Sequence, residues 1–419
     1  MRKSCGAVLA ILGALPLSAQ EEHKEQVVVI RAAKILTMGP QGVVNRGVIL
    51  VRGGRIVEVG ENVTVPEGAT VLDAGESWAV PGFIDLHCHI AGSMWDINEM
   101  NHPRNPELDT LSTIDPESER LKIAAAAGVT TVLYIPGSGT SMSGFGVLLN
   151  TGGGRTIDDL VLRFPGALKI AHSGNNPRRS GGDLGTSRMG LWWAMRRALG
   201  RAKAYHEAWT NFEKGRTRVR PARQPDLDLM RGLFEGKYPV IVHTVDAGGV
   251  MGTARILGDE YGLRVIVSHG EFGGYRVAPE MARRGLHCNI GPRLIDIEAP
   301  GYGYIDRGAF WGIAAKYFEA GCTDLSINTD APVVPQEDLA FQAAMCVRYG
   351  LPVDAALRGL TIAPARAVLA DRWVGSLEPG KHADVVLWSG EPLDVRSYVR
   401  TTIIRGKVVY DAVRDGRRY

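Results

Sequence analysis

Short apolar segments that end in a metal-ligand residue recur along this chain. The four clearest end in His87 and His89, in His243, in His269 and in Asp330, at residues 82–89, 239–243, 264–269 and 325–330. Side chains two positions apart point to the same face of a strand, so His87 and His89 face the same way. Ligands at several strand ends can meet where the carboxyl ends of neighbouring parallel strands share one rim. The pattern therefore favours α/β folds that bring strand ends together.

The stretches between these segments have the pattern of helices that close on glycine. Helix-like runs end near Gly128, Gly262, Gly285 and Gly321, and a strand pattern follows each glycine. Eight strands are expected, near residues 82–89, 129–135, 145–150, 166–172, 238–243, 264–269, 286–290 and 324–330. Alternating strands and helices of this number predict a (β/α)8 TIM barrel over residues 81–370.

Several motifs, taken in their order along the chain, resemble one enzyme superfamily. They are the run from Pro81 to His89, the strand-end His243 and His269, the Thr329-Asp330 pair, and the tail from Val374 to Val386. From about residue 27 to residue 411 the chain closely resembles the metal-dependent amidohydrolase superfamily, and within it the branch of imidazolonepropionase and Xaa-Pro dipeptidase. The resemblance implies a barrel hydrolase with one or two divalent metals, flanked by a small β-sandwich built from both chain ends.

The two chain ends have the pattern of short strands on their own. Residues 47–59 contain two apolar runs around a Gly-Gly turn, and residues 402–410 repeat this style. Neither half is long enough to bury a good core by itself. Residues 27–80 together with residues 371–415 are therefore expected to form one composite β-sandwich domain.

The resemblance also implies a set of metal ligands. His243 and His269 would hold one metal and His87 with His89 the other, with Asp330 on the side of the His-x-His pair. A single-metal site made of His87, His89, His243 and Asp330, with His269 orienting the nucleophile or the substrate, is also open. Zinc is the expected metal, although histidine and carboxylate ligands suit other first-row ions as well.

Lys169 lies in the expected strand over residues 166–172. In binuclear relatives a carboxylated lysine or a glutamate at this strand bridges the two metals, and Lys169 occupies the matching place. An ammonium group pointing into a barrel would otherwise be costly to bury. In the branch of the superfamily that this chain resembles, the sequence after this strand often continues with Gly-Glu-Asn-Pro. This chain has Asn175 at the position of that glutamate. The number of metals is therefore open, and a structural or substrate-facing Lys169 is the alternative.

Two further residues are candidates for substrate binding. His172 closes the same expected strand and could touch the substrate or a metal, with a hydrogen-bonded pocket histidine as the alternative. Arg178 could hold a substrate carboxylate with two parallel hydrogen bonds. A solvated basic loop is the other interpretation of Arg178.

The expected reaction is hydrolysis of a carbon–nitrogen bond in a small-molecule amide, cyclic amide or dipeptide. A divalent metal would activate water and polarise the carbonyl, and Asp330 would pass the water proton to the departing nitrogen. A deaminase of this fold would usually have His-x-x-Glu, whereas the acid after His243 is the shorter Asp246. A non-catalytic binding protein would be expected to have lost ligands. Loops determine the substrate, so the sequence does not identify it. The sequence also leaves open whether the protein forms a homo-oligomer.

The composition is that of an ordinary globular protein. The chain has 419 residues, of which 45% are hydrophobic and 22% charged, and its formal net charge is +3. Such a small net charge does not indicate a nucleic acid or an anionic membrane as a partner.

The first 19 residues have the pattern of an export signal. Arg2 and Lys3 precede an apolar core from Ala7 to Leu17, and the chain becomes polar at Gln20. This core is too short to span a bilayer comfortably. We therefore expect a cleaved signal peptide and a periplasmic or extracellular protein, with an uncleaved anchor as the alternative.

Overall fold

The computed structural model describes residues 26–172, 187–297 and 310–417. The expected signal peptide over residues 1–19 and the candidate Arg178 lie outside the described residues. None of the described helices is both long enough and apolar enough to cross a membrane.

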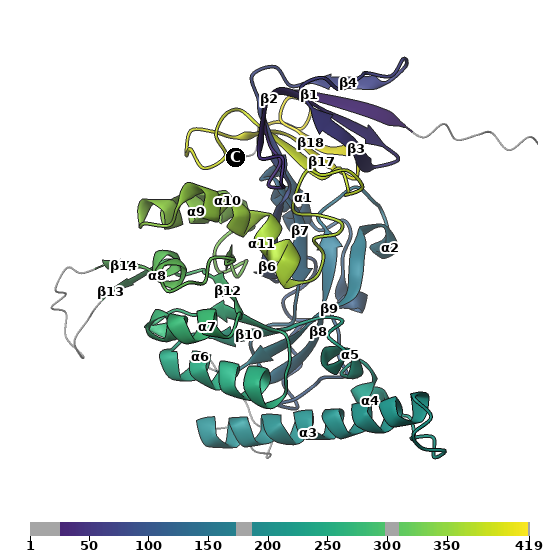
Figure 1. Cartoon of the computed structure of the whole chain (residues 1–419), viewed down its shortest axis with the longest axis vertical. Helices are drawn as coiled ribbons and strands as arrows, with labels where there is room; N and C mark the ends of the chain where they lie inside the picture. Colours follow the sequence, from purple (N-terminus) through teal and green to yellow (C-terminus); the bar gives the residue numbers. More distant parts are fainter. Residues whose placement is uncertain (1–25, 173–186, 298–309, 418–419) are drawn as a thin grey trace, which may run out of the picture.

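An eight-stranded sheet curls into a nearly closed barrel at the centre of the molecule (Figure 1). Its strands are β6 (Phe83–Cys88), β7 (Val129–Tyr134), β8 (Met142–Asn150), β9 (Val161–Ala171), β10 (Val240–Thr244), β11 (Val265–His269), β12 (His287–Ile290) and β15 (Ser326–Ile327). They follow the order β15-β12-β11-β10-β9-β8-β7-β6. A parallel bridge between Cys88 and Ala331 joins the two edges, and the amide of His89 donates to the carbonyl oxygen of Ala331 at 2.8 Å. The fold is therefore mixed α/β with a TIM-barrel-like arrangement.

One strand departs from the regular alternation that we predicted. β8 runs antiparallel to both of its neighbours, with Thr131 opposite Asn150 on one side and Met142 opposite Ile170 on the other. The physical reason is the length of the connections. A parallel crossover needs a dozen or more residues, whereas only residues 135–141 separate β7 from β8 and the single turn α2 (Ile157–Leu160) precedes β9. The start of β8 therefore lies at the rim where the parallel strands end.

Helices cover the outside of the barrel. They are α1 (Glu119–Ala126), α3 (Arg188–Glu213), α4 (Pro225–Asp228), α5 (Arg231–Phe234), α6 (Ala247–Thr253), α7 (Ala278–Arg283), α8 (Ile313–Glu319), α9 (Leu339–Arg348), α10 (Val353–Leu360) and α11 (Ile362–Ala367). A π-helical segment, Ala254–Glu260, continues α6, and the hairpin β13 (Ile295–Ile297) and β14 (Phe310–Gly312) precedes α8. Helix α3 runs along the base of the molecule in Figure 1.

The inner layer of the barrel is apolar directly beneath polar strand ends. Ala167, Ile241 and Ile266 are fully buried members of one apolar cluster. Lys169 and His243 follow Ala167 and Ile241 by two positions, so the same strand faces carry them one layer higher. The alternation of each strand thus places an apolar floor below the candidate site.

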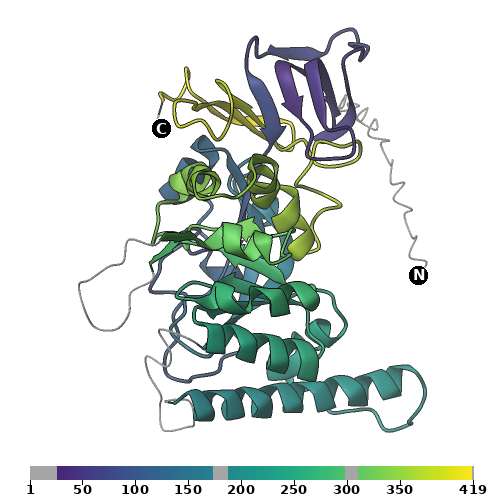
Figure 2. The ribbon, with the colours of Figure 1, turned by 60° about the vertical axis from the view of Figure 1, so that its left-hand side comes forward.

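Both ends of the chain contribute to a second eight-stranded sheet. Its strands are β1 (Val27–Leu36), β2 (Val43–Arg52), β3 (Arg55–Gly60), β4 (Thr70–Asp73), β5 (Trp78–Pro81), β16 (Val385–Trp388), β17 (Val399–Ile404) and β18 (Lys407–Asp411). β16 pairs antiparallel with β5, and β4 pairs with β1. The yellow strands of the C-terminal end lie beside the purple strands of the N-terminal end in Figure 2. Gly54 in the β2–β3 turn has φ +77°, and a Cβ there would lie 2.7 Å from the carbonyl oxygen of Arg405. The two-layer β-sandwich and the domain limits stay a prediction.

A buried carboxylate connects this terminal sheet to the barrel. Asp384 accepts hydrogen bonds from the amide of Arg405 at 2.8 Å and from Nδ2 of Asn150 in β8 at 3.3 Å. The amide of Gly82 donates to the carbonyl oxygen of Asp384 at 2.9 Å. Asp384 therefore connects the start of the barrel, at Gly82, to the C-terminal part of the terminal sheet.

Candidate active site

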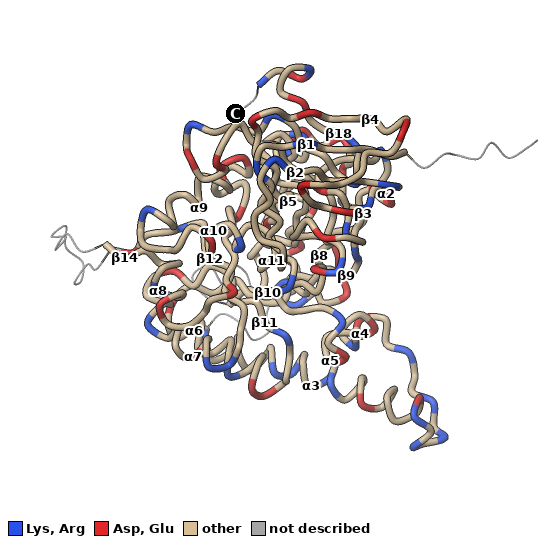
Figure 3. Tube along the Cα trace, turned by 45° about the horizontal axis from the view of Figure 1, so that its top comes forward, with Lys and Arg blue, Asp and Glu red and all other residues tan. Residues whose placement is uncertain are grey.

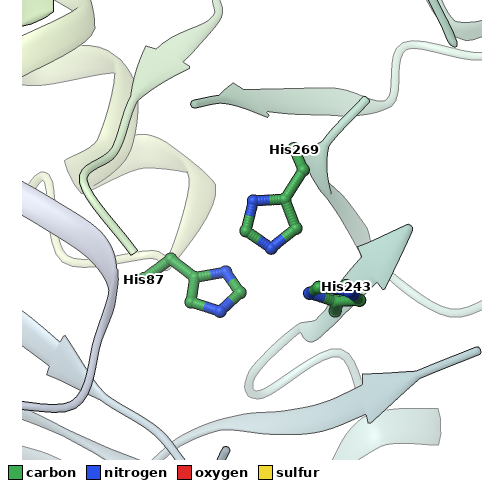
Figure 4. Close-up of side chains that lie close together, drawn as sticks. All are labelled: His87, His243 and His269. Atoms are coloured by element: carbon green, nitrogen blue, oxygen red, sulfur yellow. The ribbon is translucent and has the colours of Figure 1, made fainter. Parts of the chain in front are cut away.

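The five strand-end residues converge at one rim of the barrel. Figure 4 shows the rings of His87, His243 and His269 around one space. The ring of His269 lies 4.5 Å from the rings of both His87 and His243, centre to centre. Nε2 of His87 and Nε2 of His89 each lie 3.3 Å from Oδ1 of Asp330. All four histidines are buried, and the side chain of Asp330 is 15% exposed.

These residues form two overlapping groups that could each hold a metal ion. One consists of His87, His243 and His269, and the other of His87, His89 and Asp330. Within each group the ligand atoms lie within 4.8 Å of one another. His87 belongs to both groups, so it lies between the two candidate positions.

Backbone carbonyl groups fix the orientation of two of the rings. Nδ1 of His89 lies 2.7 Å from the carbonyl oxygen of Ile135, and Nδ1 of His269 lies 2.6 Å from that of Gly291. A carbonyl oxygen accepts only, so Nδ1 must carry the hydrogen in both rings. In its neutral form each ring therefore presents the lone pair of Nε2 to the centre of the site, which is the usual arrangement of a metal-ligating histidine.

Unpaired ring nitrogens at this centre fit a divalent metal. Both ring nitrogens of His243 and Nε2 of His269 are buried, and they have no hydrogen-bond partner within the described residues. Leaving one such group unsatisfied costs about 1–3 kcal/mol. Burial also lowers the pKa of His87 and of His243 well below the ordinary value, so both rings are neutral and can donate a lone pair. Neutral imidazoles with one carboxylate are a typical zinc donor set.

A chain of polar side chains extends from His87 through the barrel. Nδ1 of His87 lies 2.7 Å from Oγ of Ser268, and Nδ2 of Asn289 donates to the same oxygen at 3.2 Å. Oγ of Ser326 donates to Oδ1 of Asn289 at 2.7 Å and lies 2.8 Å from Nε2 of His287. We did not predict Ser268 or Asn289 as site residues, and the only sequence signal is a polar residue inside an apolar strand.

Lys169 points at the same centre. Its Nζ lies 2.8 Å from Nε2 of His87, and the side chain is fully buried. Burial lowers the pKa of Lys169 to about 7, although the neighbouring charge of Asp330 opposes this shift. A large part of this amine is therefore neutral near neutral pH.

Asp330 is held in an unusual backbone conformation by a second buried carboxylate. Its φ is +50°, which is uncommon for a residue with a side chain. Asp85 accepts hydrogen bonds from Thr329 through the amide at 3.1 Å and the hydroxyl at 2.6 Å. It also accepts from the amide of His87 at 2.9 Å and from Gln336 at 2.8 Å. Asp85, which we did not predict, thereby ties β6 to the segment that carries Asp330.

The ionisation of Asp330 follows from its neighbours. Burial raises its pKa, but a hydrogen bond from His89 and the positive charges of His269, His89 and Lys169, each in its protonated form, lower it further than burial raises it. The net pKa lies below the ordinary aspartate range. Asp330 is therefore a carboxylate that can accept a proton during a reaction.

Known proteins similar to this chain include amidohydrolases. A match to the Amidohydrolase family covers residues 344–410. Amidohydrolase tasK of Hapsidospora irregularis is 25% identical over 87% of this chain, which spans 40% of the length of tasK. Imidazolonepropionase of Acidiphilium cryptum is 22% identical, over 87% of this chain and 93% of its own length.

A solved structure decides the assignment. The crystal structure of an amidohydrolase from Thermotoga maritima MSB8 is 27% identical and has a TM-score of 0.80, over 92% of this chain and 100% of that one. This chain belongs to the amidohydrolase superfamily. Membership in this superfamily supports a hydrolase that acts on carbon–nitrogen bonds.

Two other residues of this amidohydrolase bear on the alternatives that the sequence left open. His172 lies outside both ligand groups; its Nε2 lies 2.6 Å from Oγ1 of Thr253, and its ring packs on Trp192 with centres 4.3 Å apart. Asp246 caps α6 by accepting from the amide of Gly249 at 2.8 Å, and it pairs with Arg188 at 3.0 Å. Asp246, which stands where a deaminase of this fold would usually have glutamate, is therefore engaged in a helix cap and an ion pair.

Glu271 is a further acidic residue near the centre that the sequence reasoning missed. It follows His269 by two positions, is buried, and accepts a hydrogen bond from the amide of Arg293 at 2.8 Å. Burial raises its pKa, and the charge of Asp330 adds to the shift. Its position in the loop after β11 gave no motif that could have identified it.

Proposed function

We propose that this amidohydrolase cleaves the carbon–nitrogen bond of a small amide, cyclic amide or dipeptide at the histidine centre. The observation that carries the proposal is the convergence of His87, His89, His243 and His269 beside Asp330, with buried ring nitrogens that lack a partner within the described residues. Carbon–nitrogen hydrolysis is also the chemistry of the superfamily to which the chain belongs. The donor set supports a metal-dependent route rather than a covalent one.

The four histidines and Asp330 would hold the metal, which we propose to be zinc. When bound, such an ion polarises a carbonyl group and lowers the pKa of water toward neutrality. We further propose that Lys169 is carboxylated, in which form it would add an anionic ligand for a second ion. The neutral amine would attack carbon dioxide and lose one proton, which converts a costly buried cation into an anionic ligand.

Asp330 performs the proton transfers in this mechanism. Its carboxylate accepts a proton from water as the new carbon–oxygen bond forms, and it then donates that proton to the nitrogen as the carbon–nitrogen bond breaks. Without this transfer the nitrogen would leave as an unstable anion. Oδ1 of Asp330 lies 3.3 Å from Nε2 of His87 and from Nε2 of His89, so the carboxylate stands directly beside two of the proposed ligands.

A matched pair of histidine variants tests the proposed centre. The wild type, His243→Ala and His206→Ala would be loaded with zinc, and bound metal would be measured beside turnover of N-acyl amino acids, dipeptides and cyclic amides. His206 lies on α3 and stacks on Phe234, so its loss should change neither readout. His243→Ala should lower both zinc content and turnover. Turnover that survives in His243→Ala with unchanged zinc would contradict the proposal.

A further inference from the structure

Positive charge is concentrated in one part of the chain. Residues 188–224 contain ten Lys or Arg and two Asp or Glu, a net charge of +8, whereas the whole chain has a net charge of +3. The rest of the chain therefore has a net charge of −5. The small total charge conceals a strongly basic segment. The total charge did not indicate an anionic partner, but this reasoning does not apply to the segment itself.

The densest part of this segment is the loop of residues 214–224, which we call the basic arm. It contains no Asp or Glu, and its exposed cations are Lys214, Arg216, Arg218, Arg220 and Arg223. The arm follows the end of α3 and leads back to α4, at a corner of the molecule (Figures 1 and 2). Figure 3 shows blue residues gathered on this projecting loop at the lower right.

Most of these cations have no acidic partner. Arg223 pairs with Asp228 at 2.6 Å. The other four cations of the arm form no ion pair with Asp or Glu in the described part of the chain. Like charges this close in sequence repel one another, and an anionic surface would relieve that repulsion. The arm is therefore electrostatically suited to an external anion.

We propose that the basic arm docks this protein on an anionic phospholipid surface. Clusters of four or more Lys and Arg favour such surfaces. Val219, between Arg218 and Arg220, is 75% exposed, and an apolar side chain so placed can enter the headgroup region. The contact that we propose is peripheral and uses the arm alone. This inference does not depend on the proposed hydrolase activity.

The local structure favours lipid over nucleic acid. Residues 214–224 form neither a helix nor a strand, so the arm lacks the elements that usually enter the groove of a duplex. The arm also contains no Phe, Tyr or Trp on which the bases of a single strand could stack. A phospholipid surface requires only clustered cations and an exposed apolar side chain, and the arm has both.

Vesicle flotation tests the proposal with the full chain. The wild type should float with vesicles of phosphatidylglycerol and phosphatidylcholine at low salt, should stay behind with phosphatidylcholine alone, and should be released by high salt, which shortens the Debye length. Each cation near such a surface contributes about five-fold to binding. The combined variant Lys214→Glu, Arg216→Glu, Arg218→Glu should therefore bind at least about 100-fold more weakly.

A matched variant distinguishes the effect of the basic arm from the effect of the total charge of the protein. Arg31→Glu, Arg52→Glu and Arg120→Glu reverse three exposed cations elsewhere, and this combination should still float with phosphatidylglycerol vesicles. Thermal melting would verify that both variants are folded, and Val219→Asp, which should also weaken flotation, replaces the arm variant if that variant is unfolded.

Three results would overturn the proposal. They are no binding of the wild type to phosphatidylglycerol vesicles at low salt, an equal loss in the matched variant, and tighter binding to a single-stranded oligonucleotide than to the vesicles at the same salt.

Discussion

Nζ of Lys169 lies 2.8 Å from Nε2 of His87, and both side chains are fully buried. A charged ammonium group in this position would compete with a metal for the lone pair of His87. A carboxylated lysine would instead add an anionic ligand beside it. Because these two atoms lie so close together, the chemical state of Lys169 should determine how many ions the site holds.

Removal of Lys169 should change the metal content. We expect Lys169→Ala to lower bound metal from about two ions per chain to one or none, because the remaining ligands no longer neutralise two cations. Elemental analysis of zinc-loaded protein measures this directly. Lys122→Ala is the control, since Lys122 is an exposed lysine on α1. A Lys169→Ala protein with the zinc content of the wild type would show that this lysine is structural.

Ser268 should control the orientation of His87. Ser268→Ala removes the only hydrogen-bond partner of Nδ1 of His87 in the described chain. Loss of such a contact typically weakens metal binding by about 10- to 100-fold. Competition with a coloured chelator gives the affinity, and nitrogen NMR of the metal-free protein gives the tautomer of the ring.

A second serine in the same hydrogen-bonded chain supplies the comparison. Ser326→Ala breaks the contact with Asn289 but leaves the pair of Ser268 and His87 in place, so zinc affinity should fall less. Ser268→Thr, which keeps the hydroxyl, should restore binding. Equal zinc affinity and an unchanged His87 tautomer in Ser268→Ala would contradict this role.

Asp384 should make stability depend on pH. Burial raises its pKa from 3.8 to about 6, so the folded state binds the proton more tightly than the unfolded state. This contribution to stability is fully present below the unfolded pKa and is lost as pH rises through the folded pKa. Relative to Asp384→Asn, the wild type should lose about 3 kcal/mol of unfolding free energy across this window. Urea unfolding of both proteins on either side of the window measures the difference, and a constant difference would refute the prediction.

Much of the fold was predictable because it depends on local patterns. Each of the eight barrel strands overlaps an apolar run that we expected to be a strand, and the two chain ends do share one sheet. The direction of β8 was not predictable from its own residues. It depends on residues 135–141, which are too few for a helical crossover.

The candidate site was predictable to the extent that strand ends meet at one rim. The structure brings together His87, His89, His243, His269 and Asp330, with Lys169 beside them. The residues that orient this group were not predictable. Asp85 contacts Thr329 across 244 positions of sequence, and only the closed barrel brings such partners together.

Asp330→Asn tests the central claim most directly. The variant keeps the shape of the side chain and one oxygen, but it removes the carboxylate that accepts the proton. With zinc content measured on the same sample, turnover of an amide, dipeptide or cyclic amide that the wild type hydrolyses should fall by roughly 10² to 10⁴, the usual contribution of a positioned acid and base. A fully zinc-loaded Asp330→Asn protein with near-normal turnover would contradict the proposed role of Asp330.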